Sequence, residues 1–510
     1  MQSPPPTSRG WAAATGLVAG GMALGATELF AGIVAGAPSV VLAIGDLLIS
    51  LQPPGVKQLV VDLFGTADKD VLNLAVAIGA LALCAWFGVL GARSRRASAL
   101  AFAALGGVGL LAALRQPLTS APLAVVSAGL GVGLAMLTLN GLLNMVTTPP
   151  GSMPNWSRRR FLERSAMLAA VGVSSGVVGR TLLNTRAAAP VGPGHELPVA
   201  VEPVSELPGS AQFAVAGITP VVTPNDAFYR IDTALLVPRV DAATWQLRVT
   251  GMVDNPLTLT YPDLLAMPLH EQYVTIACVS NEVGGDLVGN ALWKGVLLRD
   301  LLDMAGVRSG ASQVVGRSVD GWTSGFPTAW LAEPGREALV ALAMNGEPLP
   351  TAHGYPARLI VPGLYGYVSA TKWLAEIQLT TWDAFDAYWI PLGWSKEGPI
   401  LTQARIDLPR PNSSVGSGAT VIAGVAWAPD RGVSGVEVQV DDGAWVAAEL
   451  STPISDATWV QWRTDWTAAT GEHTLRVRAT DGTGETQTST ESRPAPNGAR
   501  GYHTIRVSVA

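Results

Sequence analysis

YVTIACVSNEVGG, residues 273–285, joins a strand-like apolar run to a polar, glycine-rich loop. Cys278 stands at this junction, in a chain that has only two cysteines. Loops at strand ends commonly carry chemistry, although a buried core cysteine acting as a small hydrophobic residue is the alternative interpretation. Nearby, strand-like runs over 312–319 and 357–363 alternate with a helical pattern over 296–307. This alternation predicts a mixed α/β domain.

Composition excludes several classes of protein. The chain has 510 residues, of which 48% are hydrophobic and 14% are charged, so it is too long for one ordinary domain and part of it is expected in a bilayer. A net charge of −6 gives no support to a nucleic-acid partner. The sequence has no C-x-x-C motif, which argues against zinc ribbons, covalent haem and iron–sulfur clusters.

The apolar excess lies in the first third of the chain, over residues 1–185, and predicts an all-α transmembrane bundle. Crossing about 30 Å of hydrocarbon takes roughly 20 apolar residues in a helix. The predicted crossings are the runs at about 11–36, 71–91, 97–114, 121–146 and 165–183. The shorter apolar stretch 38–51 carries Asp46 and is interpreted as an interfacial or re-entrant segment.

Arginine placement predicts the orientation of these runs. Arg93, Arg95 and Arg96 separate the second and third runs, and three further arginines, at 158–160, separate the fourth and fifth. Short cytoplasmic loops carry the excess of Lys and Arg, so five crossings place everything after about residue 185 outside the cytoplasm. Cys84, in the second run, then cannot pair with Cys278, which becomes an unpaired thiol in an oxidising compartment.

The segment SRRRFLE, residues 157–163, resembles the twin-arginine export signal except for Glu163 in place of the final lysine. The alternative is an ordinary positive-inside loop. Twin-arginine export carries folded proteins, often with a cofactor already inserted. The sequence leaves open whether the small-residue stretch NTRAAAP, residues 184–190, is cleaved to release the outer part.

Three regions follow the membrane runs. Residues 186–222 are rich in Pro, Gly and Val without periodicity and are interpreted as a linker. Residues 223–403 carry the α+β pattern. Residues 404–510 consist of short alternating segments separated by turn signals, which predicts an immunoglobulin-type β-sandwich without the cysteine pair.

Four segments of the exported region resemble the sulfite oxidase family of molybdopterin enzymes, in the order that the family has them. They are TPNDAFY, CVSNEVGGDLVGNALWKGVLLRDLL, NGEPLPTAHGYPARLIVPGLYGYVSATKWL and the terminal GYHTIRVSV. The resemblance covers about residues 215–510, and membrane-anchored bacterial relatives would account for the helical part. It implies an α+β molybdopterin domain over 223–403 and a β-sandwich over 404–510 that forms a homodimer.

The resemblance also implies the site residues. A molybdenum–oxo centre held by one pterin dithiolene would take Cys278 as its only protein ligand. His353 and Arg358 would hold the pterin and its phosphate, and a guanidinium fork suits phosphate well. Further cofactor contacts implied by the match are Phe228, Tyr229, Arg230, Asn281, Ser369 and Lys372. A turn-capping role for His353 and a plain surface lysine at Lys372 are the alternatives.

Departures from the family pattern bear on the substrate. Asn281 is followed by Glu282, where typical sulfite oxidases have arginine, and a carboxylate there would repel sulfite. In DGWTSGFP, residues 320–327, Trp322 replaces the family's active-site tyrosine and lacks a hydroxyl. Trp293 matches the family tryptophan of the substrate channel, and a packed core tryptophan is the alternative.

The function that follows is a membrane-anchored, extracytoplasmic molybdenum oxidoreductase. It would transfer an oxygen atom to a small oxyanion or sulfur-containing substrate in a two-electron step and pass electrons to a separate cytochrome or quinone. One alternative is a sulfoxide-type reductase with the same cofactor, which Glu282 favours. The other is a non-catalytic membrane receptor that has kept the fold, which would bind no molybdenum.

Overall fold

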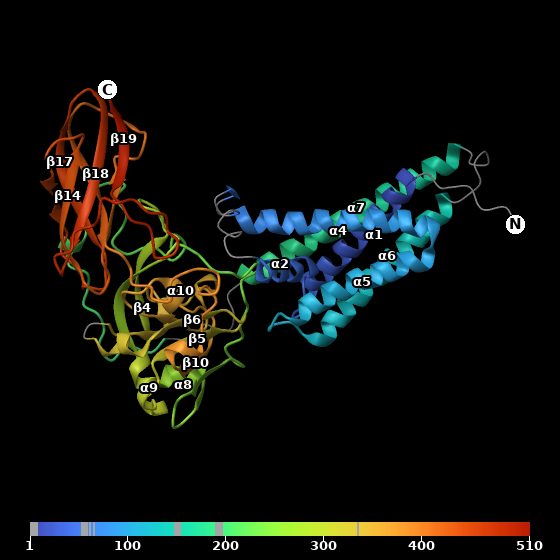
Figure 1. Cartoon of the computed structure of the whole chain (residues 1–510), viewed down its shortest axis with the longest axis horizontal. Coiled ribbons are helices and arrows are strands. Elements are labelled where there is room, and N and C mark those ends of the chain that lie inside the picture. Colours follow the sequence, from blue (N-terminus) through green and yellow to red (C-terminus); the bar gives the residue numbers. More distant parts are fainter. Residues whose placement is uncertain are drawn as a thin grey trace. The chain divides into compact units, whose positions relative to one another are not determined.

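A computed structural model of the chain describes residues 9–52, 60, 63–64, 67–146, 155–188, 197–333 and 336–510. The chain forms two compact units (Figure 1). Unit 1 comprises residues 1–189 and 234–238, and unit 2 comprises residues 190–233 and 239–510.

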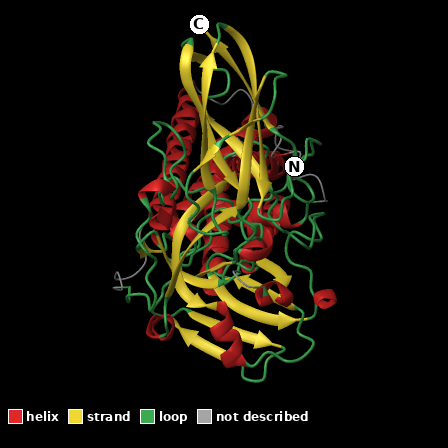
Figure 2. Ribbon diagram, turned by 90° about the vertical axis from the view of Figure 1, so that its left-hand side faces the viewer, coloured by secondary structure: helices red, strands yellow, loops and turns green. Residues whose placement is uncertain are grey.

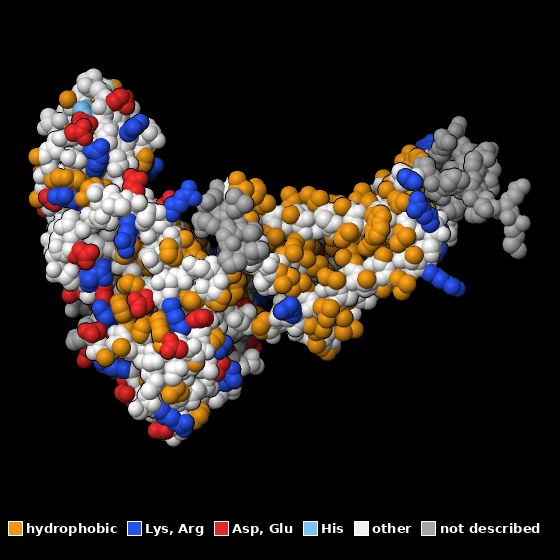
Figure 3. Space-filling model, viewed as in Figure 1, with side chains coloured by type: hydrophobic (Ala, Val, Ile, Leu, Met, Phe, Trp, Pro, Cys, Tyr) orange, Lys and Arg blue, Asp and Glu red, His pale blue; other side chains and the backbone are white. Residues whose placement is uncertain are grey.

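Unit 1 is helical. Its helices are α1 (Arg9–Ile33), α2 (Val40–Ser50), α4 (Asp68–Arg93), α5 (Arg95–Leu114), α6 (Ala121–Val146) and α7 (Asn155–Ala188). All except α2 are long and apolar enough to cross a membrane, as the sequence predicts. Hydrophobic side chains cover much of the visible face of these helices, whereas charged side chains are frequent on the visible face of unit 2 (Figure 3).

The short stretch predicted as an interfacial segment is the 11-residue helix α2. Ser39 caps its first turn by accepting a hydrogen bond from Leu42 N. The Ser39 hydroxyl also donates to Glu28 Oε1 of α1 at 2.5 Å. Glu28 is buried, and Arg180 Nη2 of α7 lies 3.6 Å from its second oxygen, Oε2. A buried carboxylate in an apolar bundle requires such partners.

Glycines let α1 pack closely against two neighbours. A Cβ built on Gly16 would overlap the backbone of Cys84 and Gly88 in α4. Likewise, a Cβ on Gly25 would overlap the Gly172 carbonyl group in α7. Small residues at such contacts allow helix backbones to approach in membranes. The α1 helix therefore lies between α4 and α7.

Unit 2 begins with two sheets. The first has the strand order β2-β1-β10-β5-β6 and the second the order β3-β4-β7-β8, with β9 paired to β7. Their strands are β1 (Gln246–Gly251), β2 (Leu257–Thr260), β3 (His270–Ala277), β4 (Val288–Leu297), β5 (Gln313–Ser318), β6 (Thr323–Pro327), β7 (Leu339–Met344), β8 (Glu347–Pro348), β9 (Arg358–Ile360) and β10 (Leu374–Thr380). Helices α8 (Tyr261–Ala266), α9 (Leu298–Ala305) and α10 (Gly366–Ser369) lie between strands in the sequence, which matches the predicted mixed pattern.

The last region of unit 2 is built of strands (Figure 2). One sheet has the order β11-β13-β17-β16 and the other the order β12-β19-β18-β14-β15. Their bounds are β11 (Gln403–Leu408), β12 (Ser414–Val415), β13 (Gly418–Trp427), β14 (Val433–Val440), β15 (Val446–Ala447), β16 (Glu449–Leu450), β17 (Val460–Ala468), β18 (Gly471–Asp481) and β19 (His503–Val509). Alternate residues of both sheets share one apolar core, which includes Ile422, Trp462, Leu475 and Ile505.

The described part of the predicted linker, residues 197–222, packs along unit 2. Val201 N donates to Leu269 O at 2.9 Å, and Phe213 N donates to Gln461 Oε1 at 2.7 Å. Ala211 is fully buried. The segment therefore connects the α/β region with the strand-rich region, a role that its lack of periodicity does not reveal.

The glycine contacts between α1 and α7 predict a position-specific effect of an added methyl group. We expect Gly179→Ala to lower the melting temperature of unit 1 in detergent, because the methyl carbon would lie 2.4 Å from Glu28 backbone atoms. Overpacking of this kind costs about 1–3 kcal/mol. Gly176→Ala, in the same helix, is the matched control, since its methyl carbon would lie 3.6 Å from Gly25 Cα. Equal melting temperatures for the two variants would contradict the close packing of these helices.

Candidate functional site

The loop that carries Cys278 starts directly after β3 and closes on itself. Cys278 N donates to Leu287 O at 2.9 Å, and Asn281 N donates to Cys278 O at 3.0 Å. The Asn281 side chain completes the turn, because its Oδ1 accepts from Leu287 N at 2.8 Å. Cys278 is 8% exposed and forms no disulfide. A strand end thus presents a fixed thiol.

A second element of the site is a cluster of basic side chains, of which Arg358 and Lys372 are buried and Arg230 is exposed. Arg358 is 4% exposed and Lys372 is 9% exposed. Lys372 Nζ donates to Asp232 Oδ2 at 2.6 Å, and Arg230 Nε donates to the same oxygen at 2.9 Å. Arg358 Nη1 donates to His353 O at 3.1 Å. Arg230 and Lys372 therefore share the Asp232 carboxylate, whereas the described hydrogen bond of Arg358 goes to a backbone carbonyl, so the cluster has an excess of positive charge.

Burial lowers the pKa of His353, Lys372 and Arg358. Desolvation lowers the pKa of His353 to about 4, with a further lowering from the Arg358 charge. His353 Nε2 therefore donates, as the neutral ring, to Asn225 O at 2.9 Å. Desolvation also lowers the pKa of Lys372 to about 8, against the opposing effect of Asp232. The pKa of Arg358 falls to about 10 for the same reason. An anion bound among these groups would reverse the shifts.

Two buried donors in the site have no partner among the residues that the structure describes. They are Arg358 Nε and Asn281 Nδ2. Buried donors in folded proteins nearly always form hydrogen bonds. Their positions, one in the basic cluster and one in the Cys278 loop, fit a large polar ligand with an anionic group. These donors and the excess of positive charge therefore suit a phosphate-bearing cofactor.

The described residues contain no cluster of three or more His, Cys, Asp or Glu side chains that could hold a metal ion. A metal at Cys278 would therefore receive fewer than three ligands of these kinds from the described residues, and a cofactor would have to supply the others. A soft thiolate suits a redox metal whose remaining ligands are sulfur.

Two tyrosines lie within electrostatic reach of the Cys278 thiol. Burial raises the pKa of Tyr229, the Cys278 charge raises it further, and Arg358 lowers it. Burial raises the pKa of Tyr365 to about 12, with opposing effects from Cys278, which raises it, and Arg500, which lowers it. The sequence analysis assigned Tyr229 to the cofactor but did not single out Tyr365 or Arg500. Tyr365 lies within a quoted motif and Arg500 directly before another, and what the sequence does not show is that the charges of Cys278 and Arg500 both act on Tyr365.

Three of the predicted site residues, Phe228, His353 and Trp293, pack together. Phe228 packs edge-on against the His353 ring at 5.7 Å and the Trp293 ring at 5.8 Å between centroids. Trp293 is fully buried, donates its Nε1 hydrogen to Val274 O at 3.2 Å, and lies under the Arg358 guanidinium at 5.0 Å. These three aromatic rings therefore lie beside the basic cluster, which the Trp293 ring contacts through Arg358. For Trp293 this placement agrees with the packed core alternative.

Two predicted residues have their described hydrogen bonds away from the Cys278 loop. Ser369 is fully buried, and its hydroxyl donates to Leu364 O at 3.2 Å and to Tyr365 O at 3.0 Å. Trp322 lies just before β6, where its carbonyl accepts from Ser318 N at 2.9 Å and its N donates to Asp320 Oδ1 at 3.1 Å. Roles in the reaction for Ser369 and Trp322 stay predictions.

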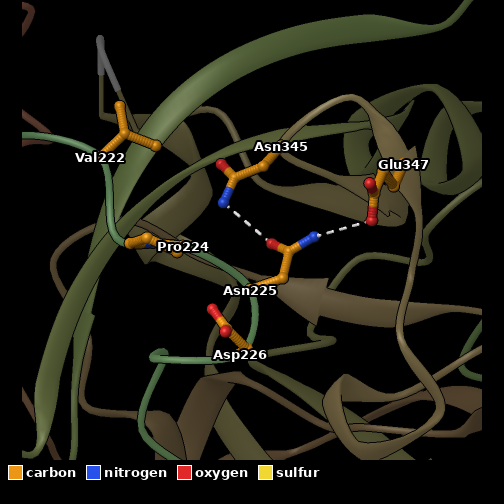
Figure 4. A pocket seen from close by; sticks show the side chains of 6 residues that line it. All are labelled: Val222, Pro224, Asn225, Asp226, Asn345 and Glu347. Atoms are coloured by element: carbon orange, nitrogen blue, oxygen red, sulfur yellow. Dashed lines mark hydrogen bonds between the residues drawn. The ribbon is translucent and has the colours of Figure 1, made fainter.

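A hollow of about 500 Å³ includes Asn225, whose carbonyl accepts from His353 (Figure 4). It is lined by Val222, Pro224, Asn225, Asp226, Asn345 and Glu347. Asn345 Nδ2 donates to Asn225 Oδ1 at 2.9 Å, and Asn225 Nδ2 donates to Glu347 Oε2 at 3.5 Å. Because the Asn225 carbonyl also accepts from His353, this network fixes the histidine from the surface side.

Residues 234–389 match the model of the oxidoreductase molybdopterin binding domain. The chain is 38% identical over 159 residues to an uncharacterized oxidoreductase, YuiH, of Bacillus subtilis, a match that covers 31% of this chain and 76% of that protein. It is 32% identical over 274 residues to mitochondrial sulfite oxidase of Rattus norvegicus, covering 45% of this chain and 49% of the relative. This chain thus spans about half the length of that sulfite oxidase.

Among solved structures, the sulfane dehydrogenase SoxCD of Paracoccus pantotrophus superposes with a TM-score of 0.51 at 24% identity. The superposition covers 57% of this chain and 82% of that chain. At this identity the similarity shows a shared fold.

The buried, neutral His353 predicts a loss of stability in acid. An unfolded histidine titrates near pH 6.5 while His353 titrates at about 4, so between these values the unfolded state binds more protons. The contribution of His353 to the free energy of unfolding of the cofactor-free protein is therefore fully present above about pH 6.5 and is lost as the pH falls toward 4. The slope from this residue is at most about 1.4 kcal/mol per pH unit. The melting temperature of unit 2, followed by tryptophan fluorescence, measures the effect.

We expect His353→Gln to flatten this acid dependence. His473→Gln is the control of opposite sign, because Asp441 raises the pKa of His473 and that residue stabilises the fold in acid. A His353→Gln protein with an unchanged acid slope would contradict the assignment of His353 as a buried neutral base.

Proposed function

This chain belongs to the oxidoreductase molybdopterin-binding domain family, and we propose that it is a membrane-anchored molybdenum oxidoreductase acting on a small sulfur oxyanion. The proposal combines the enzyme class with the helices of unit 1 and the basic groups near Cys278. A non-catalytic receptor is excluded, because the chain belongs to a family of molybdopterin-dependent enzymes.

A bound molybdenum cofactor supplies two-electron oxygen-atom transfer at the Cys278 end of the site. The Cys278 thiolate is the protein ligand to the metal. Arg358, Lys372 and Arg230 hold the cofactor phosphate, Nδ1 of the neutral His353 ring accepts a hydrogen bond from the pterin part, and Asn281 Nδ2 donates to it. The observation that carries this assignment is the unpartnered Nε of Arg358 inside an excess of positive charge. A phosphate offers the oxygens and the negative charge that this cluster lacks.

Binding of an anionic substrate is supported by Arg500 and Tyr365. The charges of Cys278 and Arg500 both act on the pKa of Tyr365, and the Tyr365 hydroxyl, which accepts from Leu401 N at 3.4 Å, keeps its own hydrogen to donate. Glu282 is exposed, so solvent weakens the repulsion that the sequence suggested. Sulfite, which the named mitochondrial relatives oxidise, is the first substrate to test. A reductase acting on sulfoxides is the second candidate, since Glu282 still lies in the Cys278 loop.

Anchoring in the membrane is supported by the packing of α7, the helix that starts with the twin-arginine-like motif. Besides its glycine contacts with α1, α7 places Arg186 Nη2 within 2.5 Å of Gly32 O and 3.0 Å of Ile33 O. These bonds satisfy carbonyls at the C-terminal end of α1. We infer that α7 stays in the bundle as a fifth crossing, so that unit 2 remains tethered outside the cytoplasm. Part of the predicted cleavage stretch, residues 189–190, lies outside the described residues.

Electrons would pass to a separate cytochrome or to quinone, because the sequence has no haem-attachment motif. The two-sheet region over 403–509 is proposed to be an immunoglobulin-type sandwich that forms a homodimer. Its shared apolar core and alternating pattern support the first part of this proposal.

Molybdenum content tests the cofactor assignment. We expect about one molybdenum atom per chain in full-length protein purified from membranes of a host that makes the cofactor. Cys278→Ala should lower or abolish metal binding, whereas Cys84→Ala, in α4, should not. Elemental analysis measures the metal, and intact mass on the same sample shows whether α7 is retained. Metal-free protein that has been folded and exported would overturn the proposed function.

Steady-state kinetics with sulfite test the anion site. Loss of one charge-assisted hydrogen bond costs about 1.5–3 kcal/mol, so Arg500→Gln should raise KM roughly tenfold or more with a smaller change in kcat. Arg506→Gln, on the exposed side of β19, is the control. Sulfite turnover that does not depend on Arg500 would remove this residue from the site, and turnover of sulfoxides alone would favour the reductase.

A further inference from the structure

The strand-rich C-terminal region reaches into the loop that carries Cys278. Arg405 of β11 donates through Nη1 to Gly285 O, in that loop, at 2.9 Å. Its Nη2 donates to Thr219 Oγ1 at 2.7 Å, and its Nε donates to Asp407 Oδ1 at 2.7 Å. One guanidinium thus joins three chain segments that are far apart in the sequence.

This joint is buried and balanced in charge. The side chains of Arg405 and Asp407 are 11% and 7% exposed. The second oxygen of Asp407 accepts from Thr219 N at 3.1 Å, which ties the segment before the α/β region to the same pair. Bonds between charged groups away from water are stronger and more directional than neutral ones on the surface. The Gly285 carbonyl therefore has a rigid partner.

A histidine from the last strand supports the adjacent residue of the loop. A Cβ on Gly284 would overlap the ring of His503, so ring and loop backbone are in direct contact. Gly284 also has φ +78°, a conformation that side chains disfavour. His503 is fixed in turn, because its Nδ1 accepts from Ile406 N at 2.9 Å, next to Arg405. Burial and the Arg405 charge lower the pKa of His503 to about 4, so the ring is neutral.

Segments next to β11 and β19 also contact the loop that carries Tyr365. Tyr365 N donates to Gly398 O at 2.7 Å, and its hydroxyl accepts from Leu401 N at 3.4 Å, just before β11. A Cβ on Gly498 would lie 2.5 Å from that hydroxyl, so the segment before β19 covers the ring. Both loops that flank the thiol thus end against the C-terminal region.

We propose that Arg405 and His503 are positioning residues that fix the Cys278 loop, so that the strand-rich region forms a structural half of the active site. The clamp they form sets the direction in which the thiol points, while the Cys278 loop itself makes the short-range turn. This inference rests on the proposed role of Cys278 as the metal ligand. The clamp itself is a property of the protein without its cofactor and is tested there.

The first test measures alkylation of Cys278 in full-length, cofactor-free protein in detergent. Iodoacetamide is the probe, and mass spectrometry of the Cys278 peptide separates this thiol from Cys84. We expect Arg405→Gln to raise the labelling rate roughly tenfold or more, because the loop opens more often once its charged partner is lost. His503→Ala should also raise the rate, by leaving Gly284 without support.

Arg463→Gln is the matched control. Arg463 pairs with Glu449 at 2.7 Å in the same sheet as β11, and its described bonds do not include either loop of the site. Its labelling rate should equal that of the unchanged chain. If Arg405→Gln loses its melting transition, Arg405→Lys replaces it, since lysine keeps the charge but cannot bridge three partners.

A second readout applies to loaded enzyme. Arg405→Gln and His503→Ala should alter the electron paramagnetic resonance spectrum of the singly reduced metal and lower kcat with little change in KM, because the ligand direction changes and the anion site does not. Labelling rates within twofold of the unchanged chain for Arg405→Lys and His503→Ala would overturn the clamp. That result would leave the molybdenum assignment untouched. Protein whose labelling rates support the clamp but which contains no molybdenum would instead contradict the proposed function and leave the clamp in place.

Discussion

The burial of Arg358 is the constraint on which the active site depends. A guanidinium cannot lose its proton under ordinary conditions, and removing it from water costs several kcal/mol unless other groups compensate. In this protein the nearby carboxylate, Asp232, is already bound by Lys372 and Arg230. Among the described residues, Arg358 contacts the aromatic face of Trp293 and donates a hydrogen bond to the His353 carbonyl. The site is therefore electrostatically complete only with an anion in it, which is the property that a phosphate-bearing cofactor uses.

Sheet topology places the strand that begins with Arg358 and the strand that leads to Cys278 in one sheet. β4 and β9 both pair with β7, so Arg358 at the start of β9 lies two strands from Trp293 in β4. β3 pairs with β4 on its other side and ends at Ala277, directly before the thiol. The same sheet thus fixes both ends of the proposed cofactor. The two site loops then rest on the C-terminal strands, which makes the whole of unit 2 necessary for the geometry.

Close packing of backbones organises unit 1 in a different way. Its helices lack a charged face, so contact between small residues replaces the hydrophobic segregation that orders soluble helices. The buried Glu28, held by Ser39 and Arg180, adds a polar tie between α1, the start of α2 and α7. These contacts make α7 part of the helical bundle of unit 1.

The sequence alone determined the features that depend on residues close together in the chain. The five apolar helices follow from runs of about 20 residues, and Cys278, His353, Arg358 and Lys372 follow from motifs whose spacing is local. Tertiary structure decided what depends on neighbours far away. It brought Arg405 and His503 against Gly285 and Gly284 of the Cys278 loop, and the Gly498 segment against Tyr365. Those contacts join segments more than 80 residues apart by charge, shape and hydrogen bonding through space, and no local pattern in the chain encodes them.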